Sequence, residues 1–160
     1  MGGGYHGGFG GTGGAAAGDA VFKSSPEQFF KNAARRADKD RNGVFDVVAH
    51  GKSSVILVEH GDTVIEADSR TVARLIRERP GYKKGQPIRL LSCDTGSSTS
   101  GFAQNLANKL NVVIEAPTKI VWAYPSGKII VAGRRKDNPQ LPDLGNRGTF
   151  KKFYPGGKKR

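Results

Sequence analysis

The chain has one cysteine, Cys93, and lacks any long apolar run. A single cysteine excludes an internal disulfide, which fits a reducing compartment, although a secreted protein with one free thiol would look the same. No stretch approaches ~20 consecutive apolar residues, so we expect no transmembrane segment. A charged segment followed by an apolar one is also missing from the N-terminus, which argues against a secretory signal peptide.

Several common catalytic motifs are absent as well. The sequence contains no Walker loop, no HExxH and no GxSxG, which narrows the classes of enzyme that it can represent.

Charge is also missing from the first 18 residues, which hold ten of the 23 glycines. A Gly-rich segment of this kind has few side chains to bury. Their burial cannot offset the backbone entropy that the segment would lose on folding. We therefore interpret residues 1–18 as a flexible leader and residues 19–160 as a single domain.

Acidic residues are scarce, and the net charge is +12. The segment from Arg134 to Arg160 alone carries nine Lys and Arg against Asp137 and Asp143, which is +7. Such a charge predicts an anionic partner: nucleic acid, an inositol phosphate, an acidic membrane or an acidic protein. The alternative is that the basic tail serves only solubility.

The hydrophobic pattern alternates between strands and helices and predicts an α/β fold with parallel strand pairs, closed by an antiparallel hairpin. The predicted helices begin at Ser25, at Asp68 or Ser69, and at Ser100. The predicted strands are 44–49, 54–58, 63–65, 88–92 and 112–114, followed by a hairpin of 119–124 and 128–132 around Pro125, Ser126 and Gly127.

The sequence contains residues that could suggest a calcium site or a zinc site. Asp38 to Gly43 matches the start of a calcium-binding EF-hand loop, but its twelfth position is Ala49 where a glutamate is needed. An Asp/Asn turn is the better interpretation. Zinc requires three or four suitably spaced ligands, which one cysteine and scattered histidines do not supply. We therefore predict no metal site.

Histidine and cysteine instead occupy equivalent places at strand ends. His50 and His60 each end an apolar strand and precede a glycine, and Cys93 follows the strand 88–92. Functional groups collect at the carboxyl ends of parallel strands, so neighbouring strands would bring His50 and Cys93 to one edge. A thiol beside an imidazole can ionise to the nucleophilic thiolate. The amides of Gly51 and Cys93 could then form an oxyanion hole.

The segments VVAHGK (47–52) and IRLLSCDTG (88–96) resemble the two signature segments of caspase-like (clan CD) cysteine peptidases. The closest likeness is to the self-processing cysteine-protease domains of large bacterial toxins, over about residues 45–154. The resemblance implies a caspase-like sheet with flanking helices and a β-hairpin flap at 119–132. It implies that His50 is the general base or imidazolium partner, that Cys93 is the nucleophile, and that His60 is not catalytic.

Those toxin domains are activated by inositol hexakisphosphate, so the resemblance suggests an anion site in the basic tail that includes Lys151 and Lys152. Two features depart from the pattern. The upstream aspartate of the family has no counterpart, because Asp46 lies about 13 Å from His50 along the same strand at ~3.3 Å per residue. The segment before His50 is also shorter than in those domains.

A Gly-rich leader before a small basic domain resembles the C-terminal effector of a polymorphic bacterial toxin. This resemblance implies a secreted or delivered effector that acts on protein in a target-cell cytoplasm, with an acidic neutralising (immunity) protein as a further partner. The rival interpretation is a nucleic-acid-directed toxin, a metal-independent nuclease or RNA-modifying enzyme. It would use the basic surface, with Tyr82, Trp122 and Tyr124 for stacking. A binding module without catalysis is the third alternative.

Overall fold

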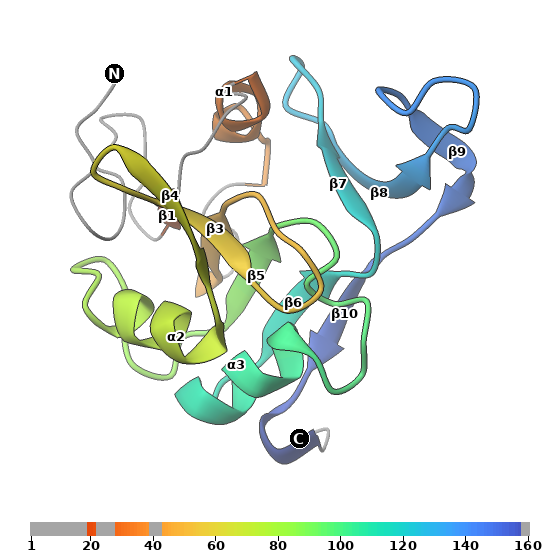
Figure 1. The fold of residues 1–160 in the computed structure, drawn as a ribbon. Coiled ribbons are helices and arrows are strands. Elements are labelled where there is room, and N and C mark those ends of the chain that lie inside the picture. The colour runs from red at the N-terminus through yellow and green to blue at the C-terminus, as the bar shows by residue number, and fades with distance from the viewer. Residues whose placement is uncertain (1–18, 22–27, 39–42, 158–160) are drawn as a thin grey trace.

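The computed structural model describes residues 19–21, 28–38 and 43–157. Three sequence features lie outside these ranges: the leader 1–18 with His6, the helix start at Ser25 and Pro26, and most of the loop that resembles a calcium site. Within the described residues the chain forms a mixed α/β fold with three separate sheets (Figure 1).

The main sheet has five strands in the order β1-β2-β5-β6-β10. Their bounds are Asp19–Val21, Phe45–Val48, Ile88–Leu91, Ile114–Pro117 and Phe150–Phe153. The first four strands run parallel to their neighbours, and β10 pairs with β6 in the antiparallel direction. All four residues of β2 and of β5 are buried, as expected for central parallel strands covered on both faces.

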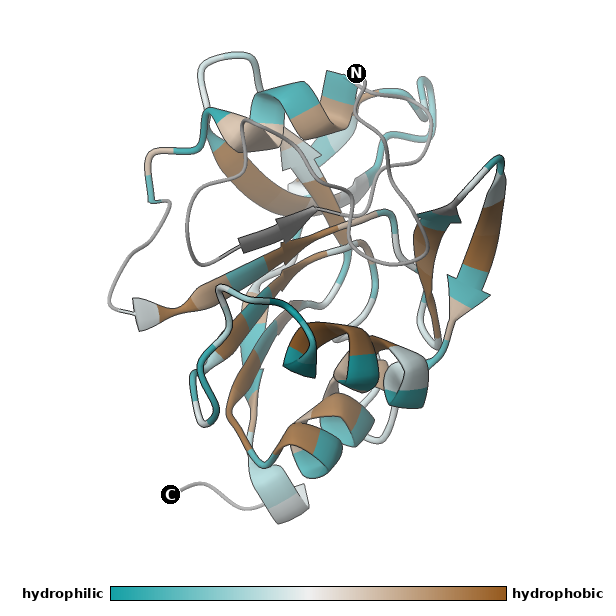
Figure 2. Cartoon of the chain, turned by 90° about the vertical axis from the view of Figure 1, so that its left-hand side faces the viewer, coloured by the Kyte–Doolittle hydropathy of each residue, from teal (hydrophilic) through white to brown (hydrophobic). Residues whose placement is uncertain are grey.

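Helices cover the two faces of this sheet (Figure 1). On one face, α2 (Ser69–Arg77) and α3 (Phe102–Leu110) pack over alternate sheet residues such as Phe45, Val47 and Leu90. On the other face, α1 (Gln28–Ala34) packs over Val48 and Leu91. The central strands are hydrophobic along most of their length, whereas the helices also carry hydrophilic residues (Figure 2).

A side-chain cap marks the start of α2, and a left-handed residue marks the end of α3. The side chain of Asp68 accepts a hydrogen bond of 2.9 Å from the Thr71 amide and so caps α2. Asn111 ends α3 in the left-handed conformation with φ of 55°. Among the described residues, no helix is both long enough and apolar enough to cross a membrane.

The remaining strands form two smaller sheets. Strands β3 (Ile56–His60) and β4 (Thr63–Ala67) make an antiparallel hairpin. Strands β7 (Ile120–Ala123), β8 (Ile129–Arg134) and β9 (Pro142–Arg147) make a three-stranded antiparallel sheet. This second sheet packs against the α1 side of the main sheet through Val121, Ala123 and Ile129.

Most of the predicted elements are confirmed, but strands β1, β9 and β10 were not predicted, and two predicted features differ from the structure. The strand predicted at 112–114 begins only at Ile114, because Val112 follows directly on the helix end. The hairpin 119–132 forms as predicted but does not close the main sheet; β10 does. That strand was missed because its two inner residues, Lys151 and Lys152, are exposed and hide the pattern.

Candidate active site

His50 and Cys93 lie at the carboxyl ends of neighbouring parallel strands. Strands β2 and β5 pair in register up to Val48 and Leu91, and the Ala49 amide donates to the Leu91 carbonyl over 3.2 Å. His50 and Cys93 each come two residues after this last pair. The two residues therefore leave the sheet at the same edge, from strands that pair directly with one another.

The two side chains also lie on the same side of the sheet. Side chains alternate along a strand, so His50 shares a face with Val48, and Cys93 shares a face with Leu91. Val48, Leu91 and Cys93 belong to one apolar cluster. The His50 ring contacts two members of that cluster, Phe29 and Phe30, with centroid distances of 5.2 Å each. The imidazole and the thiol therefore face the same environment.

Glycine at position 51 permits this arrangement. A Cβ atom there would lie 2.7 Å from the carbonyl oxygen of Cys93 and 3.1 Å from its nitrogen. The backbone after His50 thus lies directly against the backbone of Cys93. Any side chain at position 51 would force the two strand ends apart.

The amides of Gly51 and Cys93 lie beside the thiol without an oxygen partner. In the isolated bridge between Gly51 and Ile56, the hydrogen bonds run from Lys52 to Val55 and from Leu57 to His50. Within the described residues, neither the Gly51 amide nor the Cys93 amide donates to a carbonyl oxygen or a side-chain oxygen, although the Cys93 amide interacts with its own sulfur. Backbone amides near a nucleophile are the groups from which an oxyanion hole is built.

The Cys93 thiol is half-buried against strand β7. Its sulfur accepts a hydrogen bond of 3.4 Å from the Val121 amide and lies 4.0 Å from the Val121 carbonyl oxygen. Burial raises the pKa of the Cys93 thiol above its ordinary value, although the Val121 amide acts in the opposite direction. The Asp94 carboxylate adds to the rise, and Arg134 opposes it. This direction is the opposite of the low pKa that marks a pre-ionised thiolate.

A tight turn after Cys93 fixes the thiol. Asp94 adopts a left-handed conformation with φ of 63°, which is uncommon outside glycine. Its amide donates to the Lys119 carbonyl over 2.9 Å, and the Gly96 amide donates to the Pro117 carbonyl over 2.9 Å. At Gly96 a Cβ atom would meet the Ala116 carbonyl oxygen at 2.5 Å. The turn is thereby held against the end of β6 and the start of β7.

Asp46 has a different role from an acidic partner of His50. Its carboxylate lies 2.9 Å from Arg36 and 2.9 Å from Arg89, and all three side chains are at most 4% exposed. Arg89 also pairs with Asp38 over 2.6 Å. The sequence interpretation that Asp46 does not serve His50 agrees with this placement. The buried arginines were missed, because only the fold brings Arg36 and Arg89 to Asp46.

His60 lies apart from this pair of strands. Its backbone pairs with Thr63 at the tip of the β3–β4 hairpin, which belongs to a separate sheet. The expectation that the strand before His60 ends in a hairpin is confirmed. In the described ranges, no group of three or more His, Cys, Asp or Glu side chains is placed to hold a metal ion.

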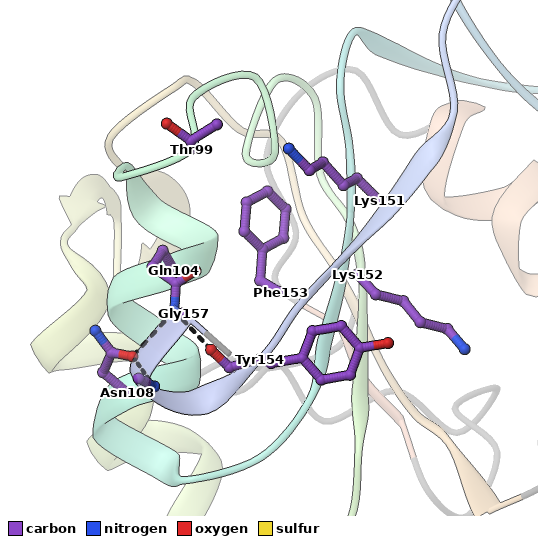
Figure 3. Close-up of a pocket in the computed structure, with 9 residues that line it drawn as sticks. Thr99, Gln104, Asn108, Lys151, Lys152, Phe153, Tyr154 and Gly157 are labelled. Carbon is purple, nitrogen blue, oxygen red and sulfur yellow. Dashed lines mark hydrogen bonds between the residues drawn. The ribbon is translucent and has the colours of Figure 1, made fainter. Parts of the chain in front are cut away.

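Lys151 and Lys152 lie on strand β10, where they line a pocket of about 460 Å³ together with part of α3 (Figure 3). The Lys151 ammonium stands 5.4 Å from the centre of the Phe153 ring, and Lys152 projects to the opposite side of the strand with Tyr154 (Figure 3). The tail packs on the domain, with Phe153 only 3% exposed. The two lysines line a pocket with α3, and no residue of the hairpin 119–132 lines it.

The pocket continues into the C-terminal turn, which is tied to α3 by two hydrogen bonds. Gln104 donates to the Tyr154 carbonyl over 2.8 Å, and the Gly156 amide donates to Asn108 over 2.9 Å. Gln104 and Asn108 thus contribute neutral amide groups to the lining of the pocket.

Residues 19–131 match a protein family described as a domain of unknown function (DUF8616). The match covers more than half of the chain and includes both strand ends described above, so the chain belongs to this family. No curated protein and no solved structure matches the chain.

Proposed function

We propose that this protein is a cysteine endopeptidase that uses His50 and Cys93 as a catalytic dyad. The observation that carries the proposal is the in-register pairing of β2 with β5, since His50 and Cys93 each come two residues after the last pair. Two further features support it: the Gly51 and Cys93 amides, which have no oxygen partner within the described residues, and the absence of a side chain at position 51.

The resting thiol is neutral, because burial raises its pKa. Catalysis therefore begins with His50 accepting the thiol proton as the sulfur approaches the substrate carbonyl carbon. A carbon–sulfur bond forms and the carbonyl π bond becomes an oxyanion. The Gly51 and Cys93 amides donate hydrogen bonds to that oxyanion, an arrangement typically worth about 3 kcal/mol per donor.

Collapse of this intermediate breaks the peptide bond. The His50 imidazolium gives its proton to the leaving amine, and an acyl-thioester remains on Cys93. Water then attacks the thioester, with His50 again accepting a proton, and the free thiol returns. The substrate is a protein, and every proton in this sequence passes through one imidazole.

The finer classification is also a proposal. The strand–His-Gly and strand–Ser-Cys arrangement, the helices on both faces and the β7–β8 hairpin beside the thiol support a caspase-like peptidase. We propose further that the domain is a bacterial toxin effector that acts in a target-cell cytoplasm. Its net charge of +12 supports an acidic neutralising protein as a partner.

An inositol hexakisphosphate activator stays a proposal that comes from the resemblance to toxin domains. Among the described residues that line the pocket beside α3, Lys151 and Lys152 are the only cations. The proposed mechanism assigns no step to the activator.

The nucleic-acid alternative has less support. Strand β10, which carries Lys151 and Lys152, is separated from β2 by two strands, β5 and β6. The Trp122 ring, a candidate stacking group, already has the guanidinium of Arg134 at 5.7 Å from its centre and donates its N–H to the Ala132 carbonyl. These placements do not connect the tail lysines to His50.

The test compares two substrates with the same protein preparations. Wild type, His50→Ala and Cys93→Ala are incubated with a peptide library and, separately, with total RNA. We expect peptide cleavage by the wild type alone and no loss of RNA. RNA degradation that persists in Cys93→Ala, without peptide cleavage, would overturn the proposal.

A further inference from the structure

The imidazole of His50 lies against two aromatic rings from helix α1. The Phe29 ring is tilted by 34° to it and the Phe30 ring by 80°, both at a centroid distance of 5.2 Å. The two phenylalanines also contact each other edge to face at 5.4 Å. One ring thus lies roughly along the plane of the imidazole and the other across it, which restricts rotation of the imidazole about its side-chain bonds.

Helix α1 is in turn tied to strand β7. The side-chain amide of Asn32 donates to the Ala123 carbonyl over 2.9 Å, and Asn32 is only 5% exposed. Gln28 donates to the Asn32 side-chain oxygen over 2.7 Å, which fixes the orientation of the Asn32 amide. Arg35 adds a longer bond of 3.3 Å to the Pro125 carbonyl.

The hairpin turn after β7 reaches the same helix. A Cβ atom on Gly127 would come 2.1 Å from the Arg35 carbonyl oxygen. Glycine at this position, with φ of +93°, therefore lets the turn pack directly on the end of α1. Helix and hairpin are held together by backbone contact as well as by side chains.

Strand β7 is also the strand that holds the thiol. Val121, two residues before Ala123, donates its amide to the Cys93 sulfur over 3.4 Å. Side chain and backbone groups thus form a continuous path from His50 through Phe29 and Phe30 to Asn32, and from there along β7 to Cys93. The contacts of His50, Asn32 and Cys93 are direct, and the backbone of α1 and of β7 joins them.

We propose that Phe29 and Phe30 are positioning residues for His50, and that Asn32 sets them relative to Cys93 through β7. This inference rests on the proposed function. In nucleophilic enzymes a third group commonly fixes the orientation of the base toward the nucleophile. Asp46 does not take that role, because it is paired with Arg36 and Arg89. The aromatic pair and its tie to β7 contribute the orientation instead.

The first test separates positioning from simple core packing. Phe29→Leu keeps an apolar side chain but loses the ring, Phe29→Tyr keeps the ring, and Lys31→Ala changes an exposed residue of the same helix. We expect Phe29→Leu to lower kcat roughly three- to tenfold with KM nearly unchanged, as the loss of an aromatic pair predicts. Phe29→Tyr and Lys31→Ala should keep the wild-type kcat.

Asn32→Leu provides an independent variant on the same path. It removes the bond to Ala123 without touching His50, so we expect the same fall in kcat with KM unchanged. Melting temperatures of all variants give the folded fraction at the assay temperature, and kcat is expressed per folded molecule. Lower melting temperature with unchanged kcat in Phe29→Leu and Asn32→Leu would show a structural role only and overturn the inference.

A second readout does not depend on activity. In the Cys93→Ala protein, the ring protons of His50 should show ring-current shifts in NMR spectra, and Phe29→Leu should reduce them. Unchanged His50 signals would overturn the aromatic contact. Peptide cleavage that persists in Cys93→Ala would overturn the proposed function, whereas Cys93-dependent cleavage with wild-type kcat in Phe29→Leu would overturn only the positioning role.

Discussion

Gly51 and Cys93 are in backbone contact: a Cβ atom on residue 51 would lie 2.7 Å from the Cys93 carbonyl oxygen. A contact below 3.0 Å with a backbone atom requires the strand ends to move. Such a shift misplaces both amides of the proposed oxyanion site and the imidazole on the preceding residue. Small displacements of this kind cost about a hundredfold in rate.

We therefore predict that Gly51→Ala lowers kcat about a hundredfold while the protein still folds. Gly145→Ala is the matched control, because a Cβ atom there meets only a side-chain oxygen of Asp143 at 3.3 Å. Circular dichroism and peptide cleavage measure the two effects. Full activity of Gly51→Ala would contradict the placement of the oxyanion site.

The two histidines that precede glycine should differ in effect. His50→Ala and Cys93→Ala should each abolish peptide cleavage, because they remove the base and the nucleophile. His60→Ala should retain most activity, because His60 ends a strand of the separate β3–β4 hairpin. Equal loss of activity in both histidine variants would point to another chemistry.

The reactivity of Cys93 should depend on pH in the way that its burial implies. Because the thiol pKa lies above the ordinary value of 9.0, alkylation by iodoacetamide at pH 6 should be slower than that of free cysteine. Unfolding in guanidinium should bring the rate to that of free cysteine. Faster alkylation of the native protein at pH 6 would show a lowered thiol pKa and a resting ion pair with His50.

The same shift predicts a change of stability with pH. The folded state holds the thiol proton more tightly than the unfolded state, so this contribution is complete below pH 9.0 and declines as pH rises toward the folded pKa. Cys93→Ala, which has no thiol, should lose less stability than the wild type between about pH 8 and 10. Denaturant melts at several pH values measure the difference. If the free energy of unfolding changed with pH equally in both proteins, the raised pKa of the Cys93 thiol would be contradicted.

The buried ion pairs predict a large effect on folding. Asp46→Asn leaves Arg36 and Arg89 buried without their shared carboxylate, and removal of one partner from such a group costs about 3–5 kcal/mol. Asp137→Asn is the control, because the pair of Asp137 with Arg135 lies on the surface and contributes little. Urea melts measure both. A cost below 1 kcal/mol for Asp46→Asn would show that water solvates the arginines.

The C-terminal strand should be part of the folding unit. Truncation after Gly148 removes β10, which pairs with β6 and buries Phe153. We expect a clear loss of melting temperature, because burial of a phenylalanine alone contributes about 3–5 kcal/mol. Lys152→Ala, an exposed change on the same strand, should have little effect. An unchanged melting temperature after truncation would show that the tail is an appendage.

The sequence by itself determined most of the helices and strands and the two residues at the strand ends. The hydrophobic pattern identified β2 and β5 because most of their residues are apolar, with one charged residue in each, and His50 and Cys93 follow them closely. It also identified the hairpin 119–132 from its turn residues. These features are local, since they depend on residues close together along the chain.

Only the tertiary structure decided how these elements meet. The register of β2 with β5 placed His50 opposite Cys93, and the fold brought Phe29, Phe30 and Val121 to the site from distant segments. The pKa of Cys93 followed the same rule: a neighbouring imidazole suggested a lowered value, but burial against β7 raises it. Desolvation depends on every residue packed around a group, and no local sequence pattern records that packing.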